Sequence, residues 1–195
     1  MKQGFVKVAS ATPRIRVADP VYNAQVICEQ AKEAAEHGAK IVVFPELCIT
    51  GYTCNDLFLQ ELLLEKAKEA LLTIAEETGQ LETLFLVGLP VDKDGRLYNV
   101  AAVLYRGRIL GMIPKKNIPM YAEFYEGRHF TPGEETVTEY RLGKQVIPFG
   151  SNLLFRCEEL PELILGCELC EDLWVAEPPS TSHALMGATV IANLS

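Results

Sequence analysis

The sequence has little positive charge, and this excludes two broad classes of partner. Its 18 Lys and Arg residues are outnumbered by 26 Asp and Glu residues, which gives the 195-residue chain a formal net charge of −8. The basic residues are also scattered, so no basic stripe is available to follow a phosphate backbone or an anionic lipid surface. The sequence therefore predicts neither a nucleic-acid-binding protein nor a membrane-binding one.

Long apolar runs and export signals are missing as well. No stretch of about 18 apolar residues occurs, and a transmembrane helix needs at least that length. The first seven residues lack the apolar core and small-residue cleavage site of a secretory signal. We therefore expect a cytoplasmic protein whose six cysteines are reduced thiols, not a disulfide framework.

Histidine is scarce, and His37, His129 and His183 are far from one another in the sequence. Cys167 and Cys170 form a C-x-x-C pair, which invites a zinc or redox interpretation, but no second pair of ligands accompanies it. Residues three apart in a strand point to opposite faces, so the two thiols are expected to diverge. The sequence therefore predicts no metal site, and redox use is the less favoured reading.

The remaining features are typical of one globular α/β domain. Hydrophobic residues make up 49% of the chain and charged residues 23%, and there is no internal repeat or second-domain boundary. The periodicity predicts a helix opened by Asp19 and Pro20 and stopped by Gly38, a helix capped by Asp56 and ended by Gly79, and a short helix ending at residue 187. Strands are expected over residues 4–11, 41–44, 84–91, 98–105, 109–113, 145–148, 153–155, 163–169 and 188–194. The polar segment between residues 121 and 139 is expected to be an ordered functional loop.

Three predicted strands end next to residues whose side chains could take part in catalysis. Cys170 stands at a strand-to-helix junction, Glu46 follows the apolar run at 41–44, and Lys115 closes the run at 109–113. Open α/β proteins place their chemistry at the carboxyl edge of the sheet. The Cys170 thiol would be the nucleophile and Glu46 the general acid and base, while Lys115 would lower the thiol pKa and stabilise an oxyanion.

Each of these residues also has a simpler interpretation. Cys170 alone could be a small buried hydrophobe, Glu46 a helix cap or surface carboxylate, and Lys115 a solvated amine. Periodicity locates the strand ends but does not show that they converge. On the residues alone, the catalytic and structural interpretations both stay open.

Several stretches resemble the nitrilase, or carbon–nitrogen hydrolase, superfamily, and in particular its glutaminase domains of glutamine-dependent NAD(+) synthetases. The resemblance rests on residues 44–58, on Pro114-Lys115 with Pro119 and the Tyr-Ala-Glu-Phe-Tyr-Glu run at 121–126, on the Glu-Leu-Cys-Glu-Asp-Leu-Trp run at 168–174, and on residues 178–180 and 192–195. It implies a four-layer α-β-β-α sandwich that is truncated at its C-terminal end. It also implies a role for six residues: Glu46 as general base, Lys115 as the cation beside the oxyanion, Cys170 as nucleophile, Glu126 as a supporting carboxylate, and Tyr121 and Phe124 in the substrate loop. Lys116, at a position usually small and polar in this branch, is not expected to replace Lys115.

The reaction implied by the resemblance is hydrolysis of the glutamine side-chain amide through a Cys170 thioester. In full-length members the ammonia travels to a second domain, which uses it to amidate adenylated nicotinic acid adenine dinucleotide. The glutaminase step needs no cofactor; ATP and Mg²⁺ are implied only for the synthetase domain, whose Ser-Gly-Gly phosphate loop is absent from these 195 residues. Homo-oligomers are also implied.

The sequence stops directly after a predicted strand, so we expect residues 1–195 to form an incomplete carbon–nitrogen hydrolase domain without its synthetase domain. Such a piece is expected to show little glutaminase activity by itself. Two alternatives remain: a free-standing amidase or nitrilase of the same superfamily, and a scaffold that has lost catalysis.

Overall fold

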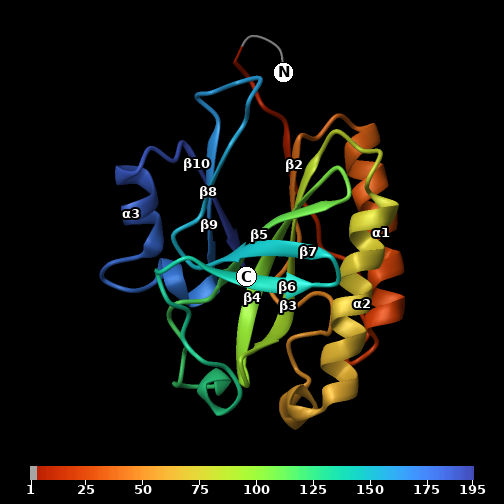
Figure 1. Cartoon of the computed structure of the whole chain (residues 1–195), viewed down its shortest axis with the longest axis vertical. Coiled ribbons are helices and arrows are strands. Elements are labelled where there is room, and N and C mark those ends of the chain that lie inside the picture. Colours follow the sequence, from red (N-terminus) through yellow and green to blue (C-terminus); the bar gives the residue numbers. More distant parts are fainter. Residues whose placement is uncertain (1–3) are drawn as a thin grey trace.

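The computed structural model describes residues 4–195 as two β-sheets stacked between helices (Figure 1). The large sheet has seven strands in the order β1-β2-β3-β4-β5-β7-β6, and the small sheet has three in the order β10-β9-β8. The strands of the large sheet are β1 (Val8–Ser10), β2 (Ile41–Val43), β3 (Leu84–Lys93), β4 (Arg96–Tyr105), β5 (Arg108–Pro114), β6 (Thr138–Leu142) and β7 (Gln145–Phe149). The small sheet contains β8 (Leu154–Arg156), β9 (Ile164–Leu169) and β10 (Val190–Leu194). The α-helices are α1 (Pro20–Glu36), α2 (Glu61–Glu77) and α3 (Pro179–Leu185), and the 3-10 helices are η1 (Asn55–Leu59), η2 (Glu126–Arg128) and η3 (Cys170–Leu173).

The predicted four-layer α-β-β-α sandwich is confirmed. Helices α1 and α2 cover one face of the large sheet, the small sheet covers its other face, and α3 lies outside the small sheet (Figure 1). Alternate residues of β3 pack into two different hydrophobic cores, one on each face of the large sheet. Phe85 and Val87 pack toward the helices, whereas Leu86 packs toward the small sheet. A sheet buried on both faces explains why its central strands are continuously apolar.

Strand direction places several chain segments at one edge of the molecule. β1, β2 and β3 run parallel, β4 is antiparallel to β3, and β5 is antiparallel to β4. β2 and β5 therefore run in the same direction and end at the same edge. The chain after each of these two ends carries a candidate site residue.

Two tight turns connect the antiparallel strands β3, β4 and β5. Asp94 and Gly95 have φ angles of 54° and 73° and connect the paired residues Lys93 and Arg96. Such two-residue turns with positive φ match the twist of the strands they join. The tight turn into β5 is built in the same way, with positive φ at residues 106 and 107.

The first strand is shorter than predicted. β1 covers only Val8–Ser10, because its one partner β2 offers three residues for pairing. Gly4 has a φ of 76° and lies in a turn instead. Residues 1–3, which were considered when a secretory signal was excluded, lie outside the described range.

The prediction that Asp56 caps the second helix is wrong. Asp56 lies in η1, and its carboxylate accepts two hydrogen bonds from the Arg128 guanidinium, at 2.7 and 2.8 Å, and contacts His129. α2 begins only at Glu61. A paired cation thus competes successfully with the backbone N–H groups that a cap would bind. Leu59 and Leu62 are more than 60% exposed, because the change from η1 to α2 breaks the helical period.

The sequence does not predict β6, whose first two residues fall within the loop expected at 121–139. Tyr140 and Leu142 point inward, and the neighbouring residues of the strand are exposed. Five residues with three polar side chains give a weak alternation, which is hard to separate from a loop. The segment before β6 contains η2 and supplies a residue of the site described next.

Candidate active site

Glu46 lies in a bend that follows β2 and crosses over β3. The bend runs close to Gly88, where an added Cβ would lie 2.3 Å from the Leu47 amide nitrogen and 2.7 Å from the Pro45 carbonyl oxygen. The Gly88 carbonyl also accepts the Ile49 N–H at 3.1 Å. Position 88 therefore has room for hydrogen only, and this close approach sets where the Glu46 carboxylate lies.

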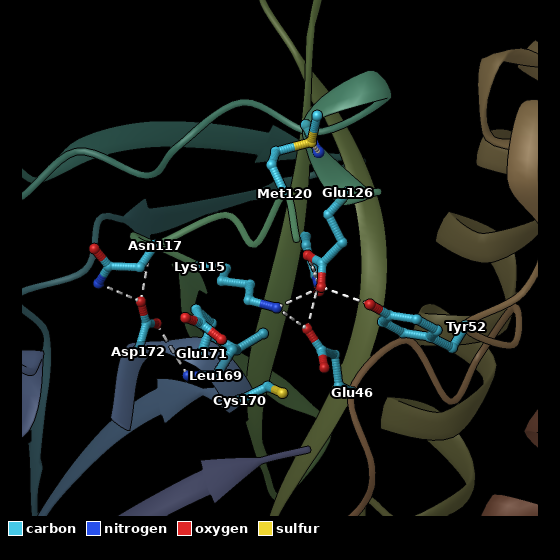
Figure 2. Close-up of polar contacts among 12 residues, drawn as sticks. Glu46, Tyr52, Lys115, Asn117, Met120, Glu126, Leu169, Cys170, Glu171 and Asp172 are labelled. Carbon is cyan, nitrogen blue, oxygen red and sulfur yellow. Dashed lines mark hydrogen bonds and ion pairs between the residues drawn. The ribbon is translucent and has the colours of Figure 1, made fainter. Parts of the chain in front are cut away.

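Lys115 follows β5 and extends the sheet ladder by donating its backbone N–H to the Asn99 carbonyl at 2.8 Å. Its side chain is fully buried, and its ammonium lies between two carboxylates (Figure 2). Nζ is 2.7 Å from Glu46 Oε1 and 2.6 Å from Glu126 Oε1. We call Glu46, Lys115 and Glu126 the buried ionic cluster.

Two neutral side chains complete the hydrogen bonding of this cluster. The Asn99 amide donates to Glu46 Oε1 at 2.6 Å and to Glu126 Oε2 at 3.3 Å. The Tyr52 hydroxyl donates to Glu126 Oε1 at 2.7 Å. Burying charge is tolerated only when the charges are paired and hydrogen-bonded, and the cluster meets both conditions.

Burial and pairing shift the protonation of the cluster in opposite ways. Burial raises the pKa of Glu46, and the nearby Lys115 ammonium only partly offsets this. Burial disfavours the Lys115 ammonium, but the two carboxylates together raise its pKa above the ordinary value. Lys115 is therefore a fixed cation, and Glu46 is a carboxylate with an increased affinity for a proton. This is the property that a general base needs.

Cys170 reaches this cluster from the small sheet. It directly follows β9 and has a φ of 40°, a left-handed conformation that costs energy for a residue with a Cβ. Figure 2 shows its sulfur pointing toward Glu46. The Lys115 ammonium is also near enough to act electrostatically on the thiol. Burial raises the pKa of this thiol above its ordinary value; Ser195 and Lys115 lower the pKa in part, and the Glu46 and Glu126 carboxylates raise it. The thiol is therefore protonated at neutral pH and needs a base to become a nucleophile.

The other cysteine, lysine and histidine residues that the sequence offered as alternatives lie outside the buried ionic cluster. Cys167 is fully buried in the core between the sheets, away from the site. The Lys116 ammonium pairs with Glu135 at the surface, and His183 is buried with Nε2 2.9 Å from the Ser151 carbonyl. All six cysteines are free thiols.

The predicted substrate residues lie in an exposed loop beside the Cys170 turn. Tyr121 is 54% exposed, packs edge-to-face on Phe124 and donates its hydroxyl to Glu171 Oε2 at 2.7 Å. Glu171 is the residue after Cys170. The loop thus meets the Cys170 turn through a phenol and a carboxylate that are both accessible from outside.

A cavity of about 210 Å³ adjoins the buried ionic cluster. Glu46 and Tyr52 line one part of it, and Ser195 lines another. The remaining wall is formed by Pro13, Ile15, Pro45 and Cys48. A small molecule at this edge would therefore meet the Glu46 carboxylate directly.

Three site residues were not identified from the sequence: Tyr52, Asn99 and Asp172. Tyr52 and Asp172 lie inside motifs that were noted, but nothing assigned them a contact. Asn99 could have been found from the sequence, because it is a polar residue within the apolar run of β4. The structure shows that it is fully buried. A buried amide usually marks a required hydrogen bond.

Other kinds of site are not seen between residues 4 and 195. No three or more His, Cys, Asp or Glu side chains in that range are grouped so that they could hold a metal ion. No helix there is long and apolar enough to cross a membrane.

Comparisons with known proteins place the chain in a family. The family model described as carbon-nitrogen hydrolase matches residues 7–195. The chain is 42% identical over 194 residues to a glutamine-dependent NAD(+) synthetase of Mycobacterium tuberculosis and 34% identical over 196 residues to one of Thermotoga maritima. It is covered completely in both alignments but spans only 29% and 30% of those relatives.

Solved structures give the same picture. A glutamine-dependent NAD(+) synthetase from Cytophaga hutchinsonii superimposes with a TM-score of 0.84 at 28% identity, covering 96% of this chain and 30% of that one. A nitrilase-superfamily amidase from Nesterenkonia superimposes with a TM-score of 0.72 at 21% identity, covering 97% of this chain and 64% of that one. The second likeness concerns the fold alone.

Proposed function

Because this chain belongs to the carbon–nitrogen hydrolase family, we propose that it hydrolyses the side-chain amide of glutamine through a thioester on Cys170. The observation that carries the proposal is the buried ionic cluster facing a thiol held in a strained turn. The similar NAD(+) synthetases are named as glutamine-dependent, which supports glutamine as the amide.

The reaction begins with a proton transfer. Glu46 takes the thiol proton, and the Cys170 sulfur attacks the amide carbon of glutamine. The Lys115 ammonium, fixed by Glu126, stabilises the oxyanion that forms on the amide oxygen. Glu46 then returns the proton to the amide nitrogen, and the C–N bond breaks. Ammonia departs, and a γ-glutamyl thioester remains on Cys170.

The second half of the reaction uses the same groups. Glu46 removes a proton from water, the hydroxide attacks the thioester carbon, and the C–S bond breaks. Glutamate leaves, and the proton held by Glu46 returns to the sulfur. Glu126 receives no proton in this scheme, and its role is to hold Lys115 together with Tyr52 and Asn99.

The proposal extends to the whole protein. The ammonia would serve the amidation that makes NAD(+), in a synthetase domain that binds ATP and Mg²⁺; the glutaminase step itself would use side chains only. A cytoplasmic homo-oligomer fits the family resemblance. These statements rest on relatives of which this chain spans about 30%.

Labelling of Cys170 tests the proposal. We expect the glutamine analogue 6-diazo-5-oxo-L-norleucine to alkylate Cys170 in the protein expressed at the full length its gene encodes, and we expect that protein to release glutamate from glutamine. Cys170→Ala should abolish both. Cys157→Ala, which removes the other partly exposed thiol, should change neither.

The same experiment separates the alternatives. Hydrolysis of acetamide or propionamide at a higher kcat/KM than glutamine would favour a free-standing amidase. An unlabelled Cys170 and no amide hydrolysis would favour a silent scaffold. Peptide mapping by mass spectrometry identifies the labelled residue.

Recognition of an amino-acid substrate gives a second prediction. Glutamine carries an ammonium at its α-carbon, and Glu171 presents a carboxylate next to the nucleophile and is oriented by Tyr121. Glu171→Gln should raise the KM for glutamine about 10-fold and leave kcat within about 3-fold, because binding is weakened without changing the reacting groups. Steady-state kinetics would check this. Glu177→Gln, at an exposed carboxylate further along, should match the unmodified protein.

A further inference from the structure

Asp172 is a buried carboxylate that the reaction above does not use. It lies in η3, is 1% exposed, and accepts hydrogen bonds on both oxygens. Oδ1 accepts the Asn117 N–H at 2.7 Å and the Asn117 side-chain amide at 2.9 Å. Oδ2 accepts the Leu169 N–H at 3.1 Å and the Lys116 N–H at 3.4 Å.

The residues that donate these hydrogen bonds lie at the ends of strands from two different sheets. Leu169 directly precedes Cys170 at the end of β9, in the small sheet. Lys116 directly follows Lys115, and Asn117 comes next, beyond the end of β5 in the large sheet. One carboxylate therefore holds the residue before Cys170 and the two residues after Lys115. Figure 2 shows its bonds to Leu169 and Asn117.

The strained turn at Cys170 needs such support. A φ of 40° at a residue with a Cβ persists only when neighbouring contacts determine it. The Leu169 N–H bond to Asp172 closes the turn from inside. The Asn193 amide also donates to the Cys170 carbonyl, at a longer distance of 3.5 Å.

We infer that Asp172 is a positioning residue, whose carboxylate fixes the Cys170 turn of the small sheet against the Lys115 segment of the large sheet. The chemistry requires an acid at this position. All four bonds are N–H donors, and a carboxylate accepts on both oxygens. An asparagine of the same shape accepts on one oxygen only and turns its own N–H groups toward two of the donors.

Glu168 provides a matched control. It is also 1% exposed, and it lies one residue before Leu169. Its carboxylate accepts the Ser180 N–H at 2.9 Å and the Asn193 amide at 3.4 Å, so it ties α3 and β10 to β9. None of these partners belongs to the Lys115 segment. Glu168→Gln thus removes a buried carboxylate of the same strand end and leaves the Asp172 bonds to Lys116 and Asn117 in place.

The test compares Asp172→Asn with Glu168→Gln in the protein at its full encoded length. For Asp172→Asn we expect kcat for glutamine to fall about 10- to 100-fold, with KM within about 3-fold, because a displacement near 1 Å is enough for such a loss. Alkylation of Cys170 by chloroacetamide, followed by mass spectrometry, should slow at least about 5-fold. Glu168→Gln should stay within about 2-fold in all three measurements.

A milder variant covers the case in which Asp172→Asn does not fold. Asn117→Ala removes one donor from a partly exposed side chain, and it should slow alkylation about 2- to 3-fold at an unchanged Tm. The inference is overturned if Asp172→Asn and Asn117→Ala lose the same stability as Glu168→Gln while they keep the kcat and the Cys170 alkylation rate of the parent protein. It rests on the proposed function only for kcat; if the parent protein does not hydrolyse glutamine, the alkylation comparison still decides the role of Asp172.

Discussion

Replacing Lys115 by methionine is expected to remove activity and to destabilise the fold at the same time. The substitution leaves Glu46 and Glu126 facing each other without a cation, and both are almost fully buried. Removing one partner of a buried ion pair typically costs about 3 to 5 kcal/mol. The rate of glutamine hydrolysis should fall about 10³-fold, because the developing oxyanion loses its nearest positive charge.

The stability loss in Lys115→Met should depend on pH. Burial already raises the pKa of Glu46 in the parent protein, and Lys115 opposes that rise. Without Lys115 the folded-state pKa increases further above the unfolded value. A group with a raised folded-state pKa favours folding below its unfolded pKa and loses that contribution as the pH rises. The variant should therefore approach the parent in urea-unfolding free energy near pH 4 and fall furthest behind it at neutral pH.

Lys116→Met is the control for this prediction. The Lys116 ammonium pairs with Glu135 at the surface, and such pairs contribute at most about 1 kcal/mol. We expect parent-like rates and a nearly unchanged unfolding free energy. A Lys115→Met protein that keeps glutamine hydrolysis within about 10-fold of the parent would show that the proposed role of Lys115 is wrong.

Gly88→Ala is expected to give the second large effect, from a position whose side chain would not touch substrate. The added methyl group would lie 2.3 to 2.8 Å from three backbone atoms of residues 45–47. Backbone cannot rotate away as a side chain does, so the bend that carries Glu46 must move. Overpacking of this kind costs about 1 to 3 kcal/mol. Moving the general base by a fraction of an ångström to 1 Å should reduce kcat by up to about 10²-fold.

Gly143→Ala separates the steric effect from the general cost of replacing glycine. Gly143 lies in the turn between β6 and β7, has a φ of 57°, and has no atom within 4 Å of an added Cβ. Its alanine variant should lose about 1 kcal/mol of stability and no activity. Circular dichroism melts and steady-state kinetics on both variants would check this. Equal activity in the two alanine variants would refute the idea that Gly88 sets the position of Glu46.

The sequence patterns predicted the helices and central strands well because the strongest patterns have direct physical causes, whereas the four-layer arrangement was implied by the family resemblance. The central strands are apolar on both faces, and the helix from Pro20 starts with a proline and a capping aspartate that accepts the Tyr22 N–H. The failures occur where a distant residue decides the local structure. Arg128 draws the Asp56 carboxylate away from a helix cap, although the two residues are 72 positions apart.

The candidate site was predictable as a set of strand ends but not as a set of contacts. Parallel strands bring Glu46 and Lys115 to one edge, and this follows from topology once the strand directions are known. The approach of Cys170 depends on how the second sheet stacks on the first, which no periodicity reveals. Asn99 and Asp172 hold the parts together through hydrogen bonds, and a sequence shows neither the donors nor the distances.

The composition of the buried ionic cluster has a consequence for the energetics of the proposed reaction. One ammonium and two carboxylates sum to a single negative charge. When a proton passes from sulfur to Glu46, that negative charge is relocated to the sulfur, and on attack it passes to the amide oxygen beside Lys115. The interior therefore neither gains nor loses an ion between substrate entry and thioester formation. Such a centre can work in a dry environment, because no step requires water to solvate a newly separated charge.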